Sequence, residues 1–143
     1  MRTIVIITAL LTILVLVPGT NAGTSSESVA VHSSSYGRIL FDGRGFVLYS
    51  FSHDPRGRST CSGACAGAWP PYLVTHAPNH GSGAKTSLLG TLRRADGKLQ
   101  ATYAGLPLYY YVGDHKPGQI LCQGVSQFGG FWRVVRPTGV PVG

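Results

Sequence analysis

Two stretches of the chain repeat one set of side chains at a spacing of sixty residues. Their shared pattern is Gly-x-x-Leu-Tyr-x-aromatic-x-x-Asp, and it supplies the candidate binding residues Tyr49, Phe51, Asp54, Tyr109, Tyr111 and Asp114. Residues i and i+2 of a strand face the same side, so each copy presents a pair of rings. A ring pair can bind a sugar or another planar ligand, and a tyrosine can serve as an axial ligand of heme iron.

The same pattern has a structural interpretation, which we favour over the ligand platform. Rings at strand spacing commonly pack in a core, and Leu48 and Leu108 then point to the opposite face. Each Asp falls where its strand should end, and its carboxylate can accept backbone N–H groups in an Asx-type turn. Replacing either Asp by Ala is then expected to cost about 1 kcal/mol, as for a lost cap, and Tyr109→Phe is expected to be nearly silent.

Three cysteines, Cys61, Cys65 and Cys122, allow one disulfide and one thiol in an exported chain. Their spacing leaves the pairing open. Cys61 and Cys65 are four residues apart, so a bond between them requires a distorted helical turn. Cys61 can instead meet Cys122 if the two copies pack about a pseudo-twofold axis.

Evidence for a cofactor or a catalytic site is weak. The thiols could join His53, His76, His80 and His115 as ligands of zinc or copper, but Pro78 interrupts the helix that would align His76 with His80. The chain has a single Glu and no Gly-x-Ser-x-Gly elbow. We therefore predict no enzyme activity and no bound cofactor, with heme or a transition metal as the alternative.

The N-terminal residues predict export. Met1-Arg2-Thr3 precedes an apolar run over residues 4–17, and Thr20 and Ala22 suit a cleavage site after Ala22. We assign residues 1–22 to a signal peptide and 23–35 to a flexible leader. The expected product is secreted or lies in the periplasm or cell envelope. It has no retained transmembrane helix, and no cysteine directly follows the apolar run for lipid attachment.

Residues 36–137 predict a small all-β domain, followed by a tail over 138–143. The 20 Gly and 9 Pro of the whole chain disfavour long helices. Turn signals predict two hairpins, the first around Asp42–Gly45 and the second around Asp96-Gly97, then a meander into residues 106–112 and a last strand near 131–135. Between the hairpins we expect a short helical turn at 61–68, capped by Ser59 or Thr60, and a polar loop over 75–87. The two motif copies occupy about 36–75 and 88–136.

The chain is basic, with 12 Lys and Arg against 5 Asp and Glu. Loss of Arg2 with the signal peptide leaves 11 basic residues. This excess favours anionic partners such as cell-envelope polymers, although a small ligand is also open. No basic run exceeds two residues and no nucleic-acid-binding motif is present, so nucleic acid is not an expected partner. The sequence does not fix the oligomeric state.

The repeated motif resembles that of a bacterial secreted-repeat family of predicted lipoproteins, whose signature is Tyr-x-(Phe/Trp/Tyr)-x-x-Asp. The matching segments are residues 49–54, 109–114 and 61–66, the last running into Trp69-Pro70-Pro71. The family's molecular function is uncharacterised. The resemblance implies a Cys61–Cys65 disulfide, with Cys122 an addition to the usual pair.

These observations together predict an exported, non-enzymatic β module that is associated with the envelope or binds a ligand. A heme- or metal-binding redox protein and a binder of carbohydrate or cell-wall polymer are the alternatives.

Overall fold

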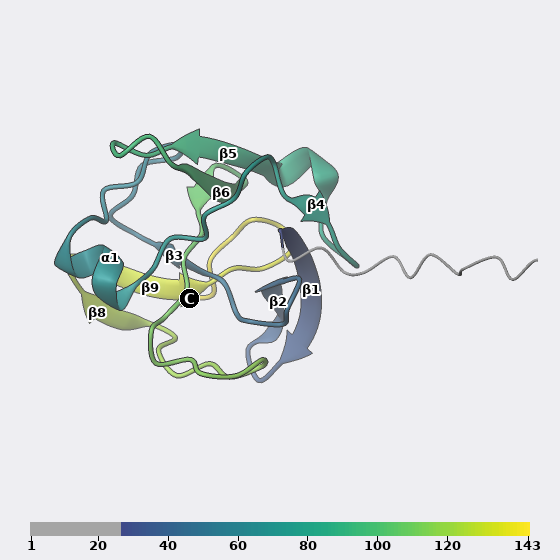
Figure 1. The fold of residues 1–143 in the computed structure, drawn as a ribbon. Helices are drawn as coiled ribbons and strands as arrows, with labels where there is room; N and C mark the ends of the chain where they lie inside the picture. Colours follow the sequence, from purple (N-terminus) through teal and green to yellow (C-terminus); the bar gives the residue numbers. More distant parts are fainter. Residues whose placement is uncertain (1–26) are drawn as a thin grey trace, which may run out of the picture.

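The computed structural model describes residues 27–143, so the predicted signal peptide and the first residues of the predicted leader lie outside the described residues. Short strands joined by tight turns and long loops make up this part of the chain, with one five-residue helix, α1 (Ala64–Ala68) (Figure 1). The predicted all-β class is thus confirmed. No helix within residues 27–143 is long and apolar enough to cross a membrane.

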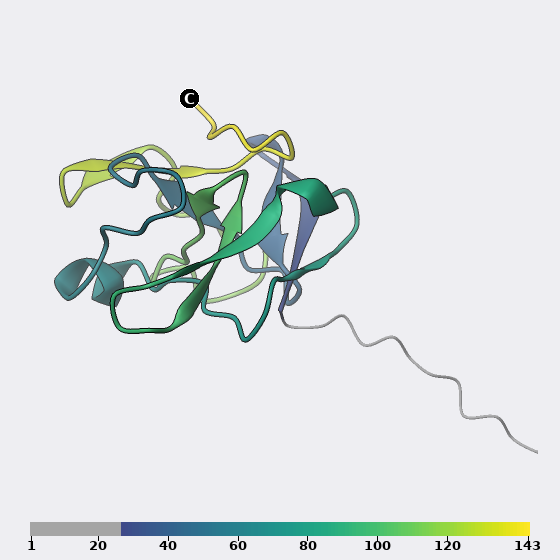
Figure 2. The same ribbon diagram turned by 90° about the horizontal axis from the view of Figure 1, so that it is seen from above.

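The strands form three sheets of three strands each. The first sheet has the order β2 (Gly37–Asp42), β1 (Ser28–Ser34), β4 (Asn79–His80). The second has the order β3 (Tyr49–Phe51), β9 (Gly130–Val134), β8 (Val125–Gln127). The third has the order β5 (Leu89–Arg93), β6 (Leu99–Tyr103), β7 (Leu106–Pro107), and a 3-10 turn, η1 (Thr86–Leu88), leads into it. Figure 2 shows β9 and the C-terminal segment on one side of the molecule, away from the tip of the β5–β6 hairpin.

The second predicted hairpin and the last strand are confirmed. β5 pairs antiparallel with β6, from Leu89 opposite Tyr103 to Arg93 opposite Leu99. Gly97 in the turn has a φ of 82°, which the Asp-Gly signal requires. Asp96 closes the turn by accepting a hydrogen bond from the Lys98 N–H at 3.0 Å.

The flexible leader is a wrong prediction from residue 28 onward. β1 pairs with β2 from Val29 opposite Asp42 to Ser34 opposite Gly37. Val29 and Val31 are buried, so their alternation marks one face of a strand. The Ser-rich composition concealed this alternation, and burial of the two valines outweighs the weak strand propensity of the serines.

The first predicted hairpin is only partly correct. Its turn forms, because the Asp42 carboxylate accepts hydrogen bonds from the N–H groups of Arg44 and Phe46, each at 2.9 Å. However, the chain leaves β2 after one bridge between Phe41 and Val47. β3 then pairs with β9 instead, with Tyr49 opposite Val134. The second strand of the expected hairpin therefore belongs to another sheet.

Other predicted boundaries also need correction. The strand expected over 106–112 is reduced to β7, after which Tyr109 bridges both Tyr49 and Pro71. Helix α1 begins after Gly63 and has no side-chain cap, so the predicted cap at Ser59 or Thr60 is wrong. The loop over 75–87 contains β4. The C-terminal tail packs on the domain: Val142 is buried, and its N–H donates to the Val134 carbonyl at 2.9 Å.

The core consists of two clusters on opposite sides of the motif strands. Tyr49, Phe51 and Tyr109 belong to the first cluster. Leu48 and Leu108 belong to the second, as the alternation of side chains along a strand predicts.

Candidate functional site

The two motif copies meet at their tyrosines. Tyr49 and Tyr109 each donate a backbone N–H to the other's carbonyl, and both bonds are 2.9 Å long. Two loops make a matching exchange: Gly57 donates to the Gly105 carbonyl at 2.8 Å, and Gly118 donates to the Gly45 carbonyl at 2.9 Å. Each bond has a counterpart with the copies interchanged, so the copies are related by a local pseudo-twofold axis.

Each motif aspartate binds the tyrosine of the other copy. The Tyr49 hydroxyl donates to Asp114 at 2.8 Å, and the Tyr109 hydroxyl donates to Asp54 at 2.5 Å. The second carboxylate oxygen closes the loop that follows. Asp54 accepts from the N–H and the hydroxyl of Thr60, and Asp114 accepts from the Leu121 N–H. The carboxylates therefore join the copies and fix both loops.

This geometry corrects the predicted Asx turn. The side-chain bonds of the two aspartates reach six or seven residues ahead and across to the other copy, whereas an Asx turn reaches two residues ahead. Loss of the Tyr109 hydroxyl would leave a buried carboxylate oxygen without its donor, which costs about 1–3 kcal/mol. On this geometry Tyr109→Phe is expected to destabilise the fold and not to be silent.

Burial also changes the acidity of this network. Desolvation, followed by the hydrogen bond to Asp114, raises the pKa of Tyr49 well above its ordinary value. Desolvation and the bond to Asp54 have the same effect on the pKa of Tyr109. Burial likewise raises the pKa of Asp114, in opposition to the hydrogen bond from Tyr49.

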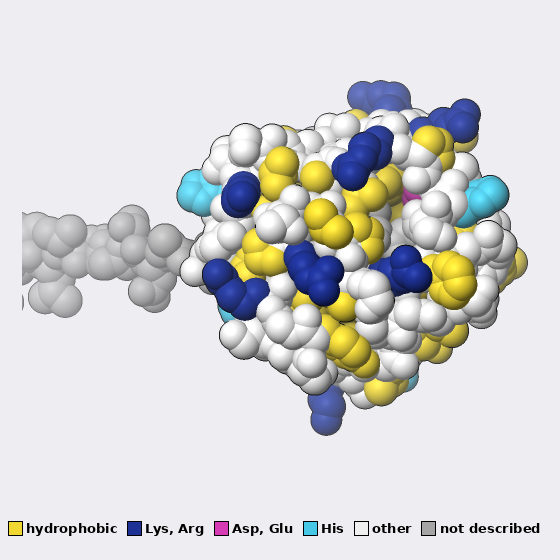
Figure 3. All heavy atoms as spheres, turned by 180° about the vertical axis from the view of Figure 1, so that it is seen from behind, with side chains coloured by type: hydrophobic (Ala, Val, Ile, Leu, Met, Phe, Trp, Pro, Cys, Tyr) yellow, Lys and Arg dark blue, Asp and Glu magenta, His cyan; other side chains and the backbone are white. Residues whose placement is uncertain are grey.

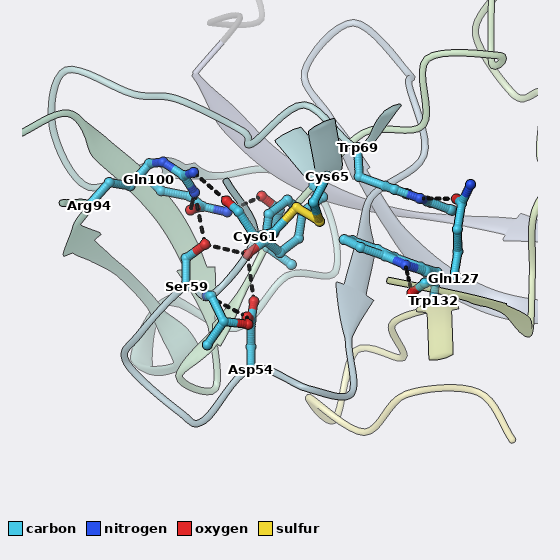
Figure 4. Close-up of a disulfide and its surroundings, with 12 residues drawn as sticks. Asp54, Ser59, Cys61, Cys65, Trp69, Arg94, Gln100, Gln127 and Trp132 are labelled. Carbon is cyan, nitrogen blue, oxygen red and sulfur yellow. Dashed lines mark hydrogen bonds between the residues drawn. A yellow bond between two sulfur atoms is a disulfide. The ribbon is translucent and has the colours of Figure 1, made fainter. Parts of the chain in front are cut away.

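A stack of aromatic rings lies beside these pairs. The rings of Trp69 and Trp132 are 4.1 Å apart and inclined by 4°, and Phe51 stacks on Trp132 at 4.2 Å. Tyr49 meets Trp69 edge to face, and Tyr109 meets Trp132 in the same way. Gln127 binds both indoles: its side-chain oxygen accepts from Trp69 and its carbonyl from Trp132 (Figure 4).

The predicted binding residues are therefore mostly core residues. Tyr49, Phe51 and Tyr109 are at most 3% exposed, and only Tyr111 is half-buried among the four rings. These rings do not form a solvent-facing platform. Both phenol oxygens in the Tyr49 and Tyr109 pairs are bound by carboxylates. The motif builds the interface between the two copies.

The Cys61–Cys65 disulfide is confirmed, with Cα atoms 5.3 Å apart, and Cys122 is a half-buried free thiol. The bridge lies at the start of α1, above the Asp54 loop (Figure 4). The expected helical distortion is seen at Gly63, which precedes α1 with a φ of 56°.

Replacing both bridged cysteines, as Cys61→Ser/Cys65→Ser, is expected to lower the free energy of unfolding by about 2 kcal/mol, the loop-closure contribution of so short a loop. Urea unfolding of the mature protein measures this loss. Cys122→Ser is the matched control and should change stability by less than about 0.5 kcal/mol. An equal loss in the control would mean that the bridge itself contributes little.

The histidines do not assemble into a metal site in the part of the chain that the structure describes. No group of three or more His, Cys, Asp or Glu side chains there lies close enough to hold an ion. His76 instead lies 3.4 Å from the Glu27 carboxylate.

All five carboxylates of the chain are used inside the fold. Asp54 and Asp114 bind tyrosines, Asp96 closes the β5–β6 turn, and Glu27 accepts bonds from Thr75. Asp42 pairs with Arg44 at 2.8 Å, the single Lys or Arg ion pair within residues 27–143. Of the 12 basic residues, Arg2 lies outside this range, so ten described cations have no carboxylate partner.

One of these unpaired cations, Arg133, lines a small hollow next to β9, and two others bond to carbonyl groups at or near it. The hollow measures about 90 Å³, and its lining includes Phe131, Arg133, Leu106, Pro141 and Asp54, whose carboxylate is bonded to Tyr109 and Thr60. The Arg133 guanidinium lies 4.9 Å from the centre of the Phe131 ring. Arg136 donates to the Pro141 carbonyl at 3.2 Å, and Arg56 donates to the Ala104 carbonyl, two residues before Leu106. We call Arg56, Arg133 and Arg136 the arginine face.

Figure 3 shows the side of the molecule that carries β9 and the C-terminal segment. Lys and Arg side chains stand among hydrophobic side chains there, and acidic side chains are almost hidden. A larger hollow of about 380 Å³ lies elsewhere, between Arg44, Tyr110 and the Pro70-Pro71 pair. Its two charged residues already have partners, since Arg44 is paired with Asp42 and Glu27 is bound to Thr75. The arginine face is therefore the stronger candidate for binding an anion.

Sequence reasoning missed three residues of the network around the motif tyrosines. Gln127 binds both indoles, and Arg94 donates a hydrogen bond to Gln100 at 2.6 Å. Gln127 and Gln100 belong to no sequence motif, and Arg94 lies at the end of the first predicted strand of the second hairpin. The observable signal was the shortage of acidic residues, which left most arginines without partners.

A family model described as "Secreted repeat of unknown function" matches residues 30–72 and 90–136. Each matched segment contains one copy of the motif, and together they cover more than half of the chain. The first match begins inside β1, in agreement with the strand that replaces the predicted leader. No curated protein and no solved structure matches the chain.

Proposed function

Because the chain belongs to the family of secreted repeats of unknown function, we propose that it is a non-enzymatic binding module that attaches to anionic polymers of the cell envelope through the arginine face. The observation that carries the proposal is the charge distribution within residues 27–143: every Asp and Glu side chain has a structural partner, whereas ten Lys and Arg side chains have no carboxylate partner.

Several features of the arginine face support a repeating anionic partner. Exposed arginines bind phosphate and carboxylate groups through paired N–H donors. Arg133 lies over an aromatic ring that is 45% exposed, so polar and apolar contacts are available side by side. The arginines come from two segments of the chain that are far apart in sequence, which suits an extended polymer better than a small ligand. The proposal needs no cofactor and places the exported protein at the envelope.

The test is sedimentation of the mature protein with purified cell walls, before and after extraction of their anionic polymers. The triple variant Arg56→Gln/Arg133→Gln/Arg136→Gln should bind at least tenfold more weakly at low salt, since each arginine near an anionic surface contributes about 1 kcal/mol. Binding of the unmodified protein should also fall as salt rises.

Arg93→Gln/Lys98→Gln/Lys116→Gln is the matched control, because it removes the same charge from the β5–β6 hairpin and from the loop after Asp114. It should retain most of the binding. If both variants lose binding equally, net charge and not the arginine face is responsible. Equal sedimentation with extracted walls would reject an anionic polymer as the partner. Visible absorbance in the purified protein would instead favour the heme or metal alternative.

A further inference from the structure

A second hollow, of about 190 Å³, lies next to the disulfide. It is enclosed by the loop that leads into α1 and by the turn between β5 and β6, and its lining comprises Ser59, Thr60, Cys61, Ser62, Arg94, Ala95 and Asp96. Figure 4 shows Arg94 extending towards Ser59 and Cys61. None of the residues of the arginine face lines this hollow.

Arg94 is held there by three hydrogen bonds. One terminal nitrogen, Nη1, donates to Ser59 Oγ at 2.9 Å and to Gln100 Oε1 at 2.6 Å. The other, Nη2, donates to the Cys61 carbonyl at 2.6 Å. All three acceptors are neutral, so they orient the guanidinium without neutralising its charge.

The acceptors are themselves fixed by the core. Gln100 is fully buried, and its amide nitrogen donates to the Leu108 carbonyl at 2.8 Å. The Ser59 oxygen lies 2.6 Å from the Tyr109 hydroxyl, which also binds Asp54. The position of Arg94 is thus set by the same network that joins the two motif copies. A ligand at Arg94 would meet a preorganised group.

The Arg94 guanidinium has N–H groups that donate to no protein acceptor. It carries five N–H groups, and its three hydrogen bonds leave two of them without a protein acceptor. No carboxylate lies within 4 Å of this half-buried cation in the described chain. The side chain of Ser62 adds a hydroxyl group to the lining. A positive charge with free, fixed donors beside hydroxyl groups is the chemistry that recognises an oxyanion.

We propose that this hollow binds a small oxyanion, a phosphate or carboxylate group, on Arg94. A volume of about 190 Å³ is smaller than the usual pocket for a whole organic ligand, so the occupant is a single group. That group is either a free ion or a phosphate of a larger molecule. Asp96 lies at the rim with one oxygen bound to the Lys98 N–H, and its charge opposes the anion.

The role of Asp96 gives a sharp test. In Asp96→Asn the like charge is removed while an oxygen remains to accept the Lys98 N–H, so the fold is retained. Inorganic phosphate should bind this variant about fivefold more tightly than the unmodified protein, as expected for loss of one nearby like charge. Arg94→Lys keeps the charge but loses the fork of donors, and should weaken binding. Arg93→Gln, one residue away, is the control and should change the affinity little.

The measurement is a titration of the mature protein with inorganic phosphate, followed by amide NMR shifts. Saturable shifts confined to residues 59–62 and 94–96 are expected. Unsaturated shifts at many arginines, or an unchanged affinity in Asp96→Asn, would overturn the proposal. Glycerol phosphodiester in place of phosphate separates the two sources, because only a site for polymer phosphate binds the diester. The triple variant of the arginine face should bind phosphate normally, so the two proposals can fail separately.

Discussion

Replacement of Trp132 by alanine is expected to lower the free energy of unfolding by about 4 kcal/mol. Trp132 is fully buried, stacks on both Trp69 and Phe51, and meets Tyr109 edge to face. Its removal leaves a cavity at the contact between the two motif copies, where the surrounding rings cannot readily collapse. Typical domains are stable by only about 5–15 kcal/mol, so this single change should bring the protein close to unfolding at room temperature. Urea unfolding followed by circular dichroism measures the loss.

The neighbouring residue provides the matched control. Phe131 precedes Trp132 in β9 but is 45% exposed, so Phe131→Ala removes a ring from the same strand without opening the core. It should cost less than about 1 kcal/mol. Comparable losses for the two variants would show that the stack does not stabilise the fold beyond ordinary strand packing.

Raising the pH above about 10 is expected to unfold the protein steeply. Burial is the main reason why four tyrosines have a pKa above the ordinary value near 10. These residues are Tyr49, Tyr72, Tyr109 and Tyr110. These groups keep their protons in the folded state when the unfolded chain has lost them. The folded state then binds more protons, so its stability falls as pH rises.

The expected slope is large. Each retained proton changes the free energy of unfolding by about 1.4 kcal/mol per pH unit, so four tyrosines give at most about 5 kcal/mol per unit above pH 10. Below pH 9 the effect should vanish. Parallel records of circular dichroism and tyrosinate absorbance should show these four tyrosines ionising together with the loss of the strands, beyond any tyrosinate from the chain's three other tyrosines.

The variant Tyr49→Phe tests whether the buried tyrosines cause this pH dependence of the unfolding free energy. It should reduce the slope by about a quarter of the four-tyrosine value, while lowering stability at neutral pH because Asp114 loses its donor. Ionisation of more than three of the seven tyrosines near pH 10 with the strands intact would show that the buried hydroxyls are accessible to solvent.

The predictable parts of the fold are those with local signals. Asp96-Gly97 specified the β5–β6 hairpin through the backbone geometry of its turn. The alternation of Leu48 with Tyr49 gave the two sides of the core correctly. β3, by contrast, pairs with β9 more than eighty residues later, because its rings pack against Trp132. No local pattern encodes that choice of partner.

The candidate site shows the same division. The motif residues were found from sequence because they repeat, but repetition does not tell whether a ring faces solvent or the core. Whether a ring is buried depends on the groups it contacts in the fold, and each aspartate binds a tyrosine that lies 55 or 65 residues away in the sequence. Arg94 was unremarkable in the sequence because two of its three acceptors, Ser59 Oγ and the Cys61 carbonyl, lie 35 and 33 residues away and carry no sequence signal.

The exchange of bonds between the copies has a consequence for how such a chain can arise. In a chain with a single copy, the tyrosine hydroxyl would have no aspartate acceptor and the aspartate would have no tyrosine donor. Two identical chains related by a twofold axis would satisfy both groups, so this symmetry is the one that a homodimer of single copies would have. Joining two copies in one chain makes their contact intramolecular, which removes the free-energy cost of bringing two subunits together. The halves then no longer need to be identical: Thr60 binds Asp54 through its hydroxyl, where Leu121 offers Asp114 only its backbone.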